Sequence, residues 1–136
     1  MVDISVTPAN VGIVEKGAPT RNVQIGEAVT AGQPLYLKAA DGKYWKADCT
    51  ASASATVAAI ALTGGATDEY IVAVFPTAKV DIGATVVVGT IYILSEAGGI
   101  APAADALTGD YVTIIGVAIT ASQIKFKPDV TGVQVP

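Results

Sequence analysis

The chain has 136 residues, which by length corresponds to one domain. Its eight basic and twelve acidic residues give a formal net charge of −4, the wrong sign for neutralising phosphates, so we expect no nucleic-acid partner. Hydrophobic residues make up 51% of the chain and charged residues only 15%, against about 25% in ordinary domains, so part of the surface must be apolar and is expected to meet a partner.

The sequence shows neither a targeting signal nor a membrane span. No positively charged segment followed by an apolar one opens the chain, and the longest nearly uncharged strand-like run, residues 82–94, is shorter than the roughly 17 to 25 residues of a membrane helix. A single cysteine cannot form an internal disulfide. We therefore expect a protein made in the cytosol, with no membrane partner and no covalent cross-link.

Residues 1–20 differ from the rest of the chain. Apolar and polar residues alternate over residues 2–7 at the period of a β-strand, and Pro8, Gly17 and Pro19 then interrupt the pattern. We expect an extended N-terminal arm over residues 1–20 and a single β domain over residues 21–136. The arm either binds another chain by β-augmentation, in which case its removal leaves thermal unfolding unchanged, or forms an edge strand of its own domain. Its candidate binding residues are Val2, Ile4, Val6, Val11, Ile13 and Val14.

Residues 29–46 read as strand, tight turn and strand. Asp41-Gly42 marks the turn, because both central residues of a type I′ turn need a positive φ. Lys43 at the tip resembles the cofactor-bearing lysine of lipoyl or biotinyl carrier domains, but the hydrophobic residues that normally flank that lysine are absent. The neighbouring aromatic residues either stack on bases or sugars or belong to the core, with nearby lysines extending over them: Tyr36, Tyr44 and Trp45.

The chain contains an internal repeat. Shifting residues 25–63 forward by 57 positions, without a gap, aligns them with residues 82–120 and gives twelve identical pairs among thirty-nine. The β-branched residues 114–120 predict a strand, so the aligned residues 57–62 are predicted to form one too. The aligned glycines include Gly26 with Gly83, Gly32 with Gly89, and Gly42 with Gly99.

Each copy of the repeat ends in a strand that precedes a proline, at residues 71–75 and 124–127. We therefore predict one β unit used twice, over about 25–76 and 82–128, with superposable backbones and with Gly42 and Gly99 at equivalent turns. The resulting fold class is an all-β sandwich or barrel with an extended N-terminal arm.

The sequence offers little reactive chemistry. It has no histidine, which is the commonest general base and metal ligand. Cys49 is the only thiol, and we interpret it as a small buried residue. The acidic residues are sparse and fall at expected turns, whereas calcium needs a dense group of oxygen ligands. We expect no enzyme, no catalytic residue, no cofactor and no metal.

Five short runs of turn and strand residues carry a family resemblance: residues 29–37 (VTAGQPLYL), 60–65 (IALTGG), 89–95 (GTIYILS), 98–102 (GGIAP) and 109–118 (GDYVTIIGVA). They resemble the small capsid decoration, or cement, proteins of tailed bacteriophages, over roughly residues 26–128. These runs contain no catalytic signature, and related β modules also occur in phage head fibres.

The resemblance implies a β-rich, commonly trimeric protein that binds the outside of an expanded capsid at local three-fold positions and holds neighbouring capsomers together. On that basis we expect a structural protein on the outer surface of a virion, whose partners are the major capsid protein and further copies of itself in a homotrimer. The alternative is a head-fibre base or a host-surface-binding β module. An enzyme or a cofactor carrier is the third possibility.

Overall fold

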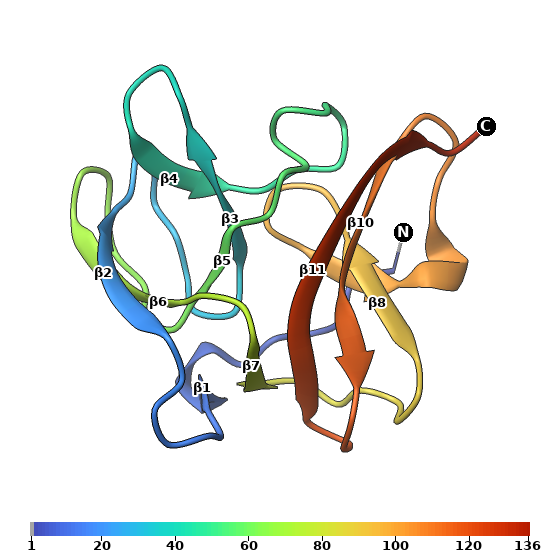
Figure 1. The fold of residues 1–136 in the computed structure, drawn as a ribbon, viewed down its shortest axis with the longest axis horizontal. Coiled ribbons are helices and arrows are strands. Elements are labelled where there is room, and N and C mark those ends of the chain that lie inside the picture. Colours follow the sequence, from blue (N-terminus) through green and yellow to red (C-terminus); the bar gives the residue numbers. More distant parts are fainter. Residues whose placement is uncertain (1) are drawn as a thin grey trace.

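The structure is a computed structural model that describes residues 2–136, so Met1 of the expected arm lies outside the described residues. Two antiparallel sheets form a sandwich-like, half-barrel fold (Figure 1), which confirms the predicted all-β class. Within the described residues, no helix is long and apolar enough to cross a membrane.

The first sheet has five strands in the order β2-β6-β5-β3-β4. The strands are β2 (Thr20–Gln24), β3 (Pro34–Lys38), β4 (Lys43–Lys46), β5 (Ala59–Ala61) and β6 (Tyr70–Val74). Directly after β2, Ile25 forms a parallel bridge with Tyr44 of β4, and the Gly26 N–H donates to the Tyr44 carbonyl at 2.9 Å. This contact joins the two edges of the sheet, which therefore closes on itself.

The second sheet has six strands in the order β1-β7-β11-β10-β8-β9. The strands are β1 (Val11–Ile13), β7 (Ala78–Ile82), β8 (Ile91–Leu94), β9 (Ile100–Pro102), β10 (Tyr111–Ala118) and β11 (Gln123–Gln134). Of two short 3-10 helices, η1 (Pro8–Asn10) directly precedes β1 and η2 (Ala103–Asp105) lies between β9 and β10. We call β2 to β6 the first unit and β7 to β11 the second unit.

Two clusters of buried apolar side chains form the core. The smaller cluster belongs to the first unit and contains Ile25 and Leu35. The larger cluster joins both units, with Ile60 from the first and Phe126 from the second. Side chains alternate along β5, so Ile60 faces the larger cluster while its neighbours face the smaller one. The two units therefore pack against each other through the larger cluster.

The same strand order recurs in the two units. Across the sheet, the first unit has the order β2-β6-β5-β3-β4 and the second has the order β7-β11-β10-β8-β9. When the strands of each unit are numbered along the chain, these two orders are the same. Hydrogen bonds recur at the offset of 57 residues as well: the Gly32 N–H donates to the Ala61 carbonyl at 2.8 Å, and the Gly89 N–H donates to the Ala118 carbonyl at 2.8 Å. This recurrence agrees with the predicted repeat, but the internal duplication itself stays a prediction.

The predicted hairpin around Asp41 is present, but its turn differs from the prediction. Lys38 pairs with Lys43, which leaves a loop of four residues rather than two between β3 and β4. Within that loop only Gly42 has a positive φ, +69°, so the turn is not of type I′. The strand predicted at residues 57–62 is also shorter and covers only Ala59–Ala61.

The corresponding hairpin of the second unit does contain a turn with two consecutive positive φ values. They lie at Ala97 (+48°) and Gly98 (+78°), and the Gly99 N–H donates to the Glu96 carbonyl at 3.0 Å. Gly99, the residue aligned with Gly42, is not in the left-handed region. The expectation of equivalent glycines was therefore wrong in backbone geometry, although both residues lie in the hairpin loops.

Candidate functional site

The arm lies along the second unit of its own chain, so the structure shows the edge-strand alternative. β1 pairs antiparallel with β7, with Val11 opposite Ile82, Gly12 opposite Asp81 and Ile13 opposite Val80. In Figure 1 the two strands lie side by side at the bottom of the molecule. The arm thus supplies an edge strand, β1, of the six-stranded sheet.

Further hydrogen bonds hold the residues that precede β1. The Ile4 N–H donates to the carbonyl of Ile100 in β9 at 2.8 Å, and the Thr7 N–H donates to the carbonyl of Gly83, just after β7, at 2.7 Å. The arm therefore contacts both edges of the second unit and lies between β7 and β9.

Glycines make room for the arm. A Cβ on Gly83 would lie 2.6 Å from the Thr7 carbonyl oxygen and 2.9 Å from Cγ2 of Val11. A Cβ on Gly32 would lie 2.7 Å from Cγ1 of Val6, and one on Gly99 would overlap the Asp3 carboxylate. We call the channel floored by Gly32, Gly83 and Gly99 and bounded by β7 and β9 the arm groove.

The first unit closes the equivalent space without an arm. A Cβ on Gly26, the counterpart of Gly83, would overlap the indole of Trp45. In the second unit the position of Trp45 is occupied by Pro102, which has no such ring, and Ile82 pairs with Val11 of the arm. The second unit is therefore completed by a segment from outside the repeat.

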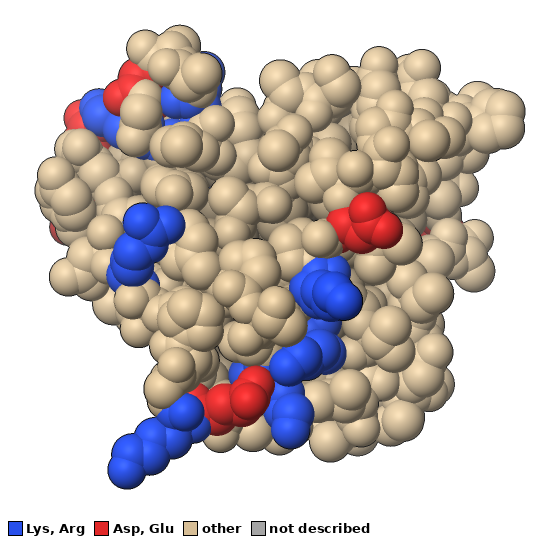
Figure 2. Space-filling model, viewed as in Figure 1, with Lys and Arg blue, Asp and Glu red and all other residues tan. Residues whose placement is uncertain are grey.

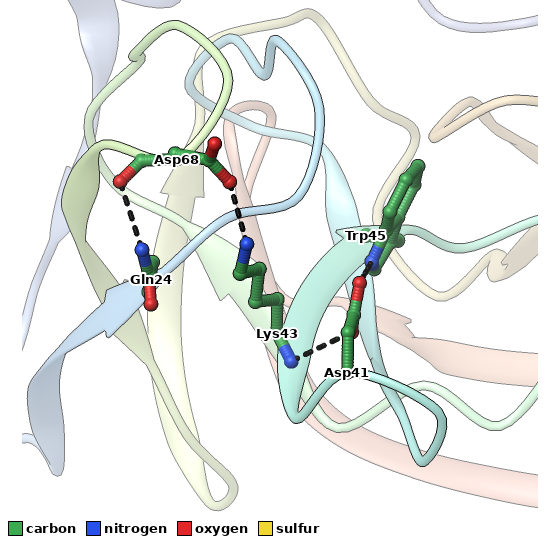
Figure 3. A network of polar contacts seen from close by, with 5 residues as sticks. All are labelled: Gln24, Asp41, Lys43, Trp45 and Asp68. Atoms are coloured by element: carbon green, nitrogen blue, oxygen red, sulfur yellow. Dashed lines mark hydrogen bonds and ion pairs between the residues drawn. The ribbon is translucent and has the colours of Figure 1, made fainter.

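The surroundings of Trp45 bear on the stacking and carrier interpretations of the β3–β4 hairpin. Gly26 covers one part of the ring, and Lys38 Nζ lies 4.1 Å from its centre. In Figure 3 the indole N–H donates to Asp41 Oδ2 at 3.0 Å, while Lys43 Nζ contacts Asp68 Oδ1 at 2.7 Å.

Stacking on a base or a sugar would need a free Trp45 indole, and a cofactor carrier would need a free Lys43 ammonium, but both groups already have partners within the protein. The side chain of Trp45 is held from two sides and is poorly placed to stack on a base or a sugar. The ammonium of Lys43 is paired, and its pKa is raised mainly by the hydrogen bond to Asp68, whose backbone carbonyl also accepts from Gln24 at 3.1 Å. The network therefore stiffens the end of the first unit.

The candidate residues of the arm fall into two groups. Ile4 is half-buried and packs against the larger core cluster, and Val6 and Val11 are half-buried beside the groove glycines. The other three keep much of their surface exposed: Val2 (75%), Ile13 (44%) and Val14 (43%). The sequence pattern treated all six as one binding set, whereas the structure uses half of them inside the domain.

Glu15 holds the end of the arm, a role that sequence reasoning missed. Its Oε1 accepts the Lys79 backbone N–H at 2.8 Å and lies 3.7 Å from Lys125 Nζ. The backbone hydrogen bond, followed by the attraction of the lysines, lowers the pKa of this carboxyl. Glu15 belongs to no recognisable sequence motif. Its partners, Lys79 and Lys125, are distant in the sequence, and only the fold brings them close to it.

A second candidate surface lies on the outer face of β8 and β10. Val117 lies directly opposite Ile91, and a hydrogen bond from Gly89 to Ala118 brings the preceding loop against the same strand. We call the resulting group of exposed apolar side chains the valine patch: Val87 (66%), Val88 (62%), Ile91 (42%), Val117 (39%) and Ile119 (36%). Sequence reasoning predicted an apolar surface but not its position.

Charged side chains are sparse on the face of the molecule shown in Figure 2, where they gather at a few places and leave most of the surface uncharged. No residue of the valine patch is charged. A surface of this composition favours association with another macromolecule over contact with water.

The one cysteine of the chain is buried. Cys49 is fully buried, and burial, together with the nearby Asp110 carboxylate, raises the pKa of its thiol to about 12. A thiol with such a pKa is protonated and unreactive at neutral pH. Among residues 2–136, no group of three or more histidine, cysteine or acidic side chains could hold a metal ion.

Comparison of the chain with protein-family models, with curated proteins and with solved structures finds no match.

Proposed function

We propose that this protein is a structural module that binds the outer surface of a tailed-phage capsid and stabilises contacts between neighbouring capsomers. Its partners are then the major capsid protein and further copies of the same chain, in a homotrimer on the virion. The turn and strand phrases that resemble capsid decoration proteins support this proposal. So does the low content of charge.

The valine patch carries the proposal. Its side chains are exposed and uncharged, and they lie on β8 and β10 or in the segments directly before β8 and after β10. Removing a valine from water contributes about 1.5 to 3 kcal/mol when the side chain becomes fully buried, so a few such residues account for firm attachment. Because half of the apolar arm residues pack on their own domain, we assign the main attachment surface to the patch and a secondary one to Val2, Ile13 and Val14.

The test uses particles of the parent virus that lack this protein. Wild-type protein and a double variant, Val87→Ser with Val88→Ser, are added to such particles, and the bound fraction is measured by co-sedimentation. We expect attachment of the double variant to be about 100-fold weaker, because two apolar side chains lose their burial at the interface. Circular dichroism checks that the variant is folded.

Val133→Ser provides the matched control. Val133 is 60% exposed on β11 and is not part of the valine patch. The control variant should bind particles as tightly as wild type. Equal binding by the double variant and the wild type would contradict the assigned surface, and failure of wild-type protein to bind particles at all would favour the alternative of a fibre or host-surface module.

A further inference from the structure

We propose that the arm groove of one copy also accepts the arm of a second copy, so that neighbouring copies of this chain exchange arms. The partner is a second copy of the same protein, and the recognised segment is its residues 2–14. This inference deepens the self-association in the proposed function, but it concerns the protein alone and can be tested without a capsid.

The groove has the properties of an acceptor site. Without an arm, β7 lacks its partner on one edge, because Val11, Gly12 and Ile13 form that ladder. The Ile100 and Gly83 carbonyls would also lose their N–H donors. Unpaired strand edges of this kind bind extended segments. The second unit is thus incomplete without an arm, and the groove does not depend on which chain supplies it.

The arm and its attachment point belong to different units. Its backbone hydrogen bonds run to the second unit, at β7, Gly83 and β9, whereas the chain continues from the arm into β2 of the first unit. An arm from another copy would form the same ladder and the same contacts with the groove glycines. Only the path of the connecting residues would change.

The connecting segment is suited to such a change of path. Gly17 has a φ of +84°, and a Cβ placed on it would have no neighbour within 4 Å. A single long backbone hydrogen bond, from Ala18 N–H to the Glu15 carbonyl at 3.4 Å, closes the turn. Opening this turn therefore breaks one long hydrogen bond and the contact of the small Ala18 side chain with the larger core cluster.

Exposed side chains on the docked arm point to the same conclusion. Ile13 and Val14 keep 44% and 43% of their surface exposed at the end of β1, although β1 is paired along β7. A second copy brought alongside by exchange would cover these residues. Because docking within one chain benefits from a high effective concentration, exchange should appear in concentrated protein or where copies are held side by side.

The first test mixes two single-cysteine variants. Gly12→Cys and Asp81→Cys lie directly opposite each other in the β1–β7 ladder, and a Cβ on Gly12 meets open space. One variant carries a C-terminal tag, and the mixture is oxidised at high protein concentration and separated by mass. A disulfide between the two kinds of chain requires the arm of one copy on β7 of the other. The native Cys49 is fully buried and should stay reduced.

Collisions between surface cysteines are measured with a control pair. Lys38→Cys and Lys43→Cys are opposite each other in the β3–β4 hairpin, which cannot be exchanged through the linker. We expect the mixed disulfide of the arm pair to exceed that of the control pair at least tenfold. Equal yields for the two pairs would overturn the proposal.

The second test shortens the linker by deleting residues 16–18. Val14 and Glu15 are bonded to Lys79, so only Pro19 would then connect the docked arm to β2 at Thr20. We expect this shorter connection to strain docking of the arm in its own groove and so to favour the groove of another copy. Light scattering should show a shift from monomer to dimer or larger assemblies. A folded monomer would contradict the proposal, and if the deletion prevents folding, the cross-linking yields decide.

Failure of these tests is distinct from failure of the proposed function. The valine patch is separate from the arm groove, so copies that do not exchange arms could still bind capsids through the patch. Conversely, if copies exchange arms but the protein does not bind particles, the inference of arm exchange is supported and the proposed capsid-binding function is contradicted.

Discussion

Gly83 and Gly89 have nearly the same backbone conformation but different neighbours. Their φ values are +72° and +83°; a Cβ on Gly83 would meet the arm, whereas one on Gly89 has no neighbour within 4 Å. Gly89→Ala should therefore cost only the strain of a positive φ, about 1 kcal/mol, while Gly83→Ala should cost about 2 to 4 kcal/mol. Chemical denaturation of both variants measures the difference.

The arm itself provides the control for this comparison. In a chain that lacks residues 1–14, the extra cost of Gly83→Ala should disappear, because Thr7 and Val11 are no longer present to clash. If the difference between the two alanine variants persists there, its cause lies elsewhere in the second unit.

Glu15 makes docking of the arm sensitive to acid. Its pKa is lowered in the folded state, first by the Lys79 backbone N–H and then by the lysine charges. A carboxyl whose folded pKa is depressed contributes stability above its unfolded pKa, near 4.3, and that contribution is lost as the pH falls through the folded value. Hydrogen exchange at the Val14 amide, which donates to the Lys79 carbonyl, reports on docking.

Between pH 6 and pH 3, protection of the Val14 amide should fall about two- to fivefold more in the wild type than in Glu15→Gln, as suits an exposed ionic contact. The glutamine keeps an oxygen for the Lys79 N–H but carries no charge. Parallel pH profiles for the two proteins would show that the charge of Glu15 plays no part.

At the scale of the element, the arm is the feature whose energetics the structure changes most. Ile4, Val6 and Val11 are half-buried, and the arm forms a ladder with β7. We therefore expect deletion of residues 1–19 to destabilise the protein by about 3 kcal/mol and to lower Tm by about 10 °C. This replaces the expectation that thermal unfolding is unaffected. Calorimetry would decide between them, and an unchanged Tm would show that docking adds no stability.

The strands of the core could be predicted from the sequence because their signals are local. β-branched runs and the alignment of residues 57–63 with 114–120 located β5 and β10. The alternation over residues 2–7 likewise indicated an extended arm. Its partner could not be predicted, because the choice of a neighbouring strand depends on which edges the folded domain leaves open, and periodicity carries no record of those edges.

The groove could be recognised only in part. The aligned pair Gly26 and Gly83 was visible in the sequence, but the repeat alone suggested equal roles for them. The difference lies in their neighbours, Trp45 in one unit and the arm in the other, at sequence separations that no local pattern connects. The replacement of Trp45 by Pro102 was the available signal that the second unit needs a different closure.

At the scale of the whole molecule, the shared core cluster predicts cooperative unfolding. Trp45 lies in the first unit and is the only tryptophan, whereas far-UV circular dichroism reports on strands of both units. Because the larger cluster joins the units through residues such as Ile60 and Phe126, the two probes should show the same denaturation midpoint. Separate midpoints would mean that each unit folds alone.

The positions of the chain ends allow the connectivity of the molecule to be rearranged. Val2 borders residues 104–107, and the Val135 N–H donates to the Asp110 carbonyl at 2.9 Å; Figure 1 shows both ends on the same side. A circular permutant could join them with a short linker and open the chain between Lys16 and Gly17, since nearby ends and exposed turns tolerate such changes.

In that permutant the arm would follow β11 through the linker, and the second unit together with its arm would become one uninterrupted stretch of chain. The arm would then be tied to the unit it completes, with a linker long enough only for its own groove. We expect a Tm close to that of the wild type and, in light scattering, a monomer at concentrations where the natural order of strands allows copies to associate.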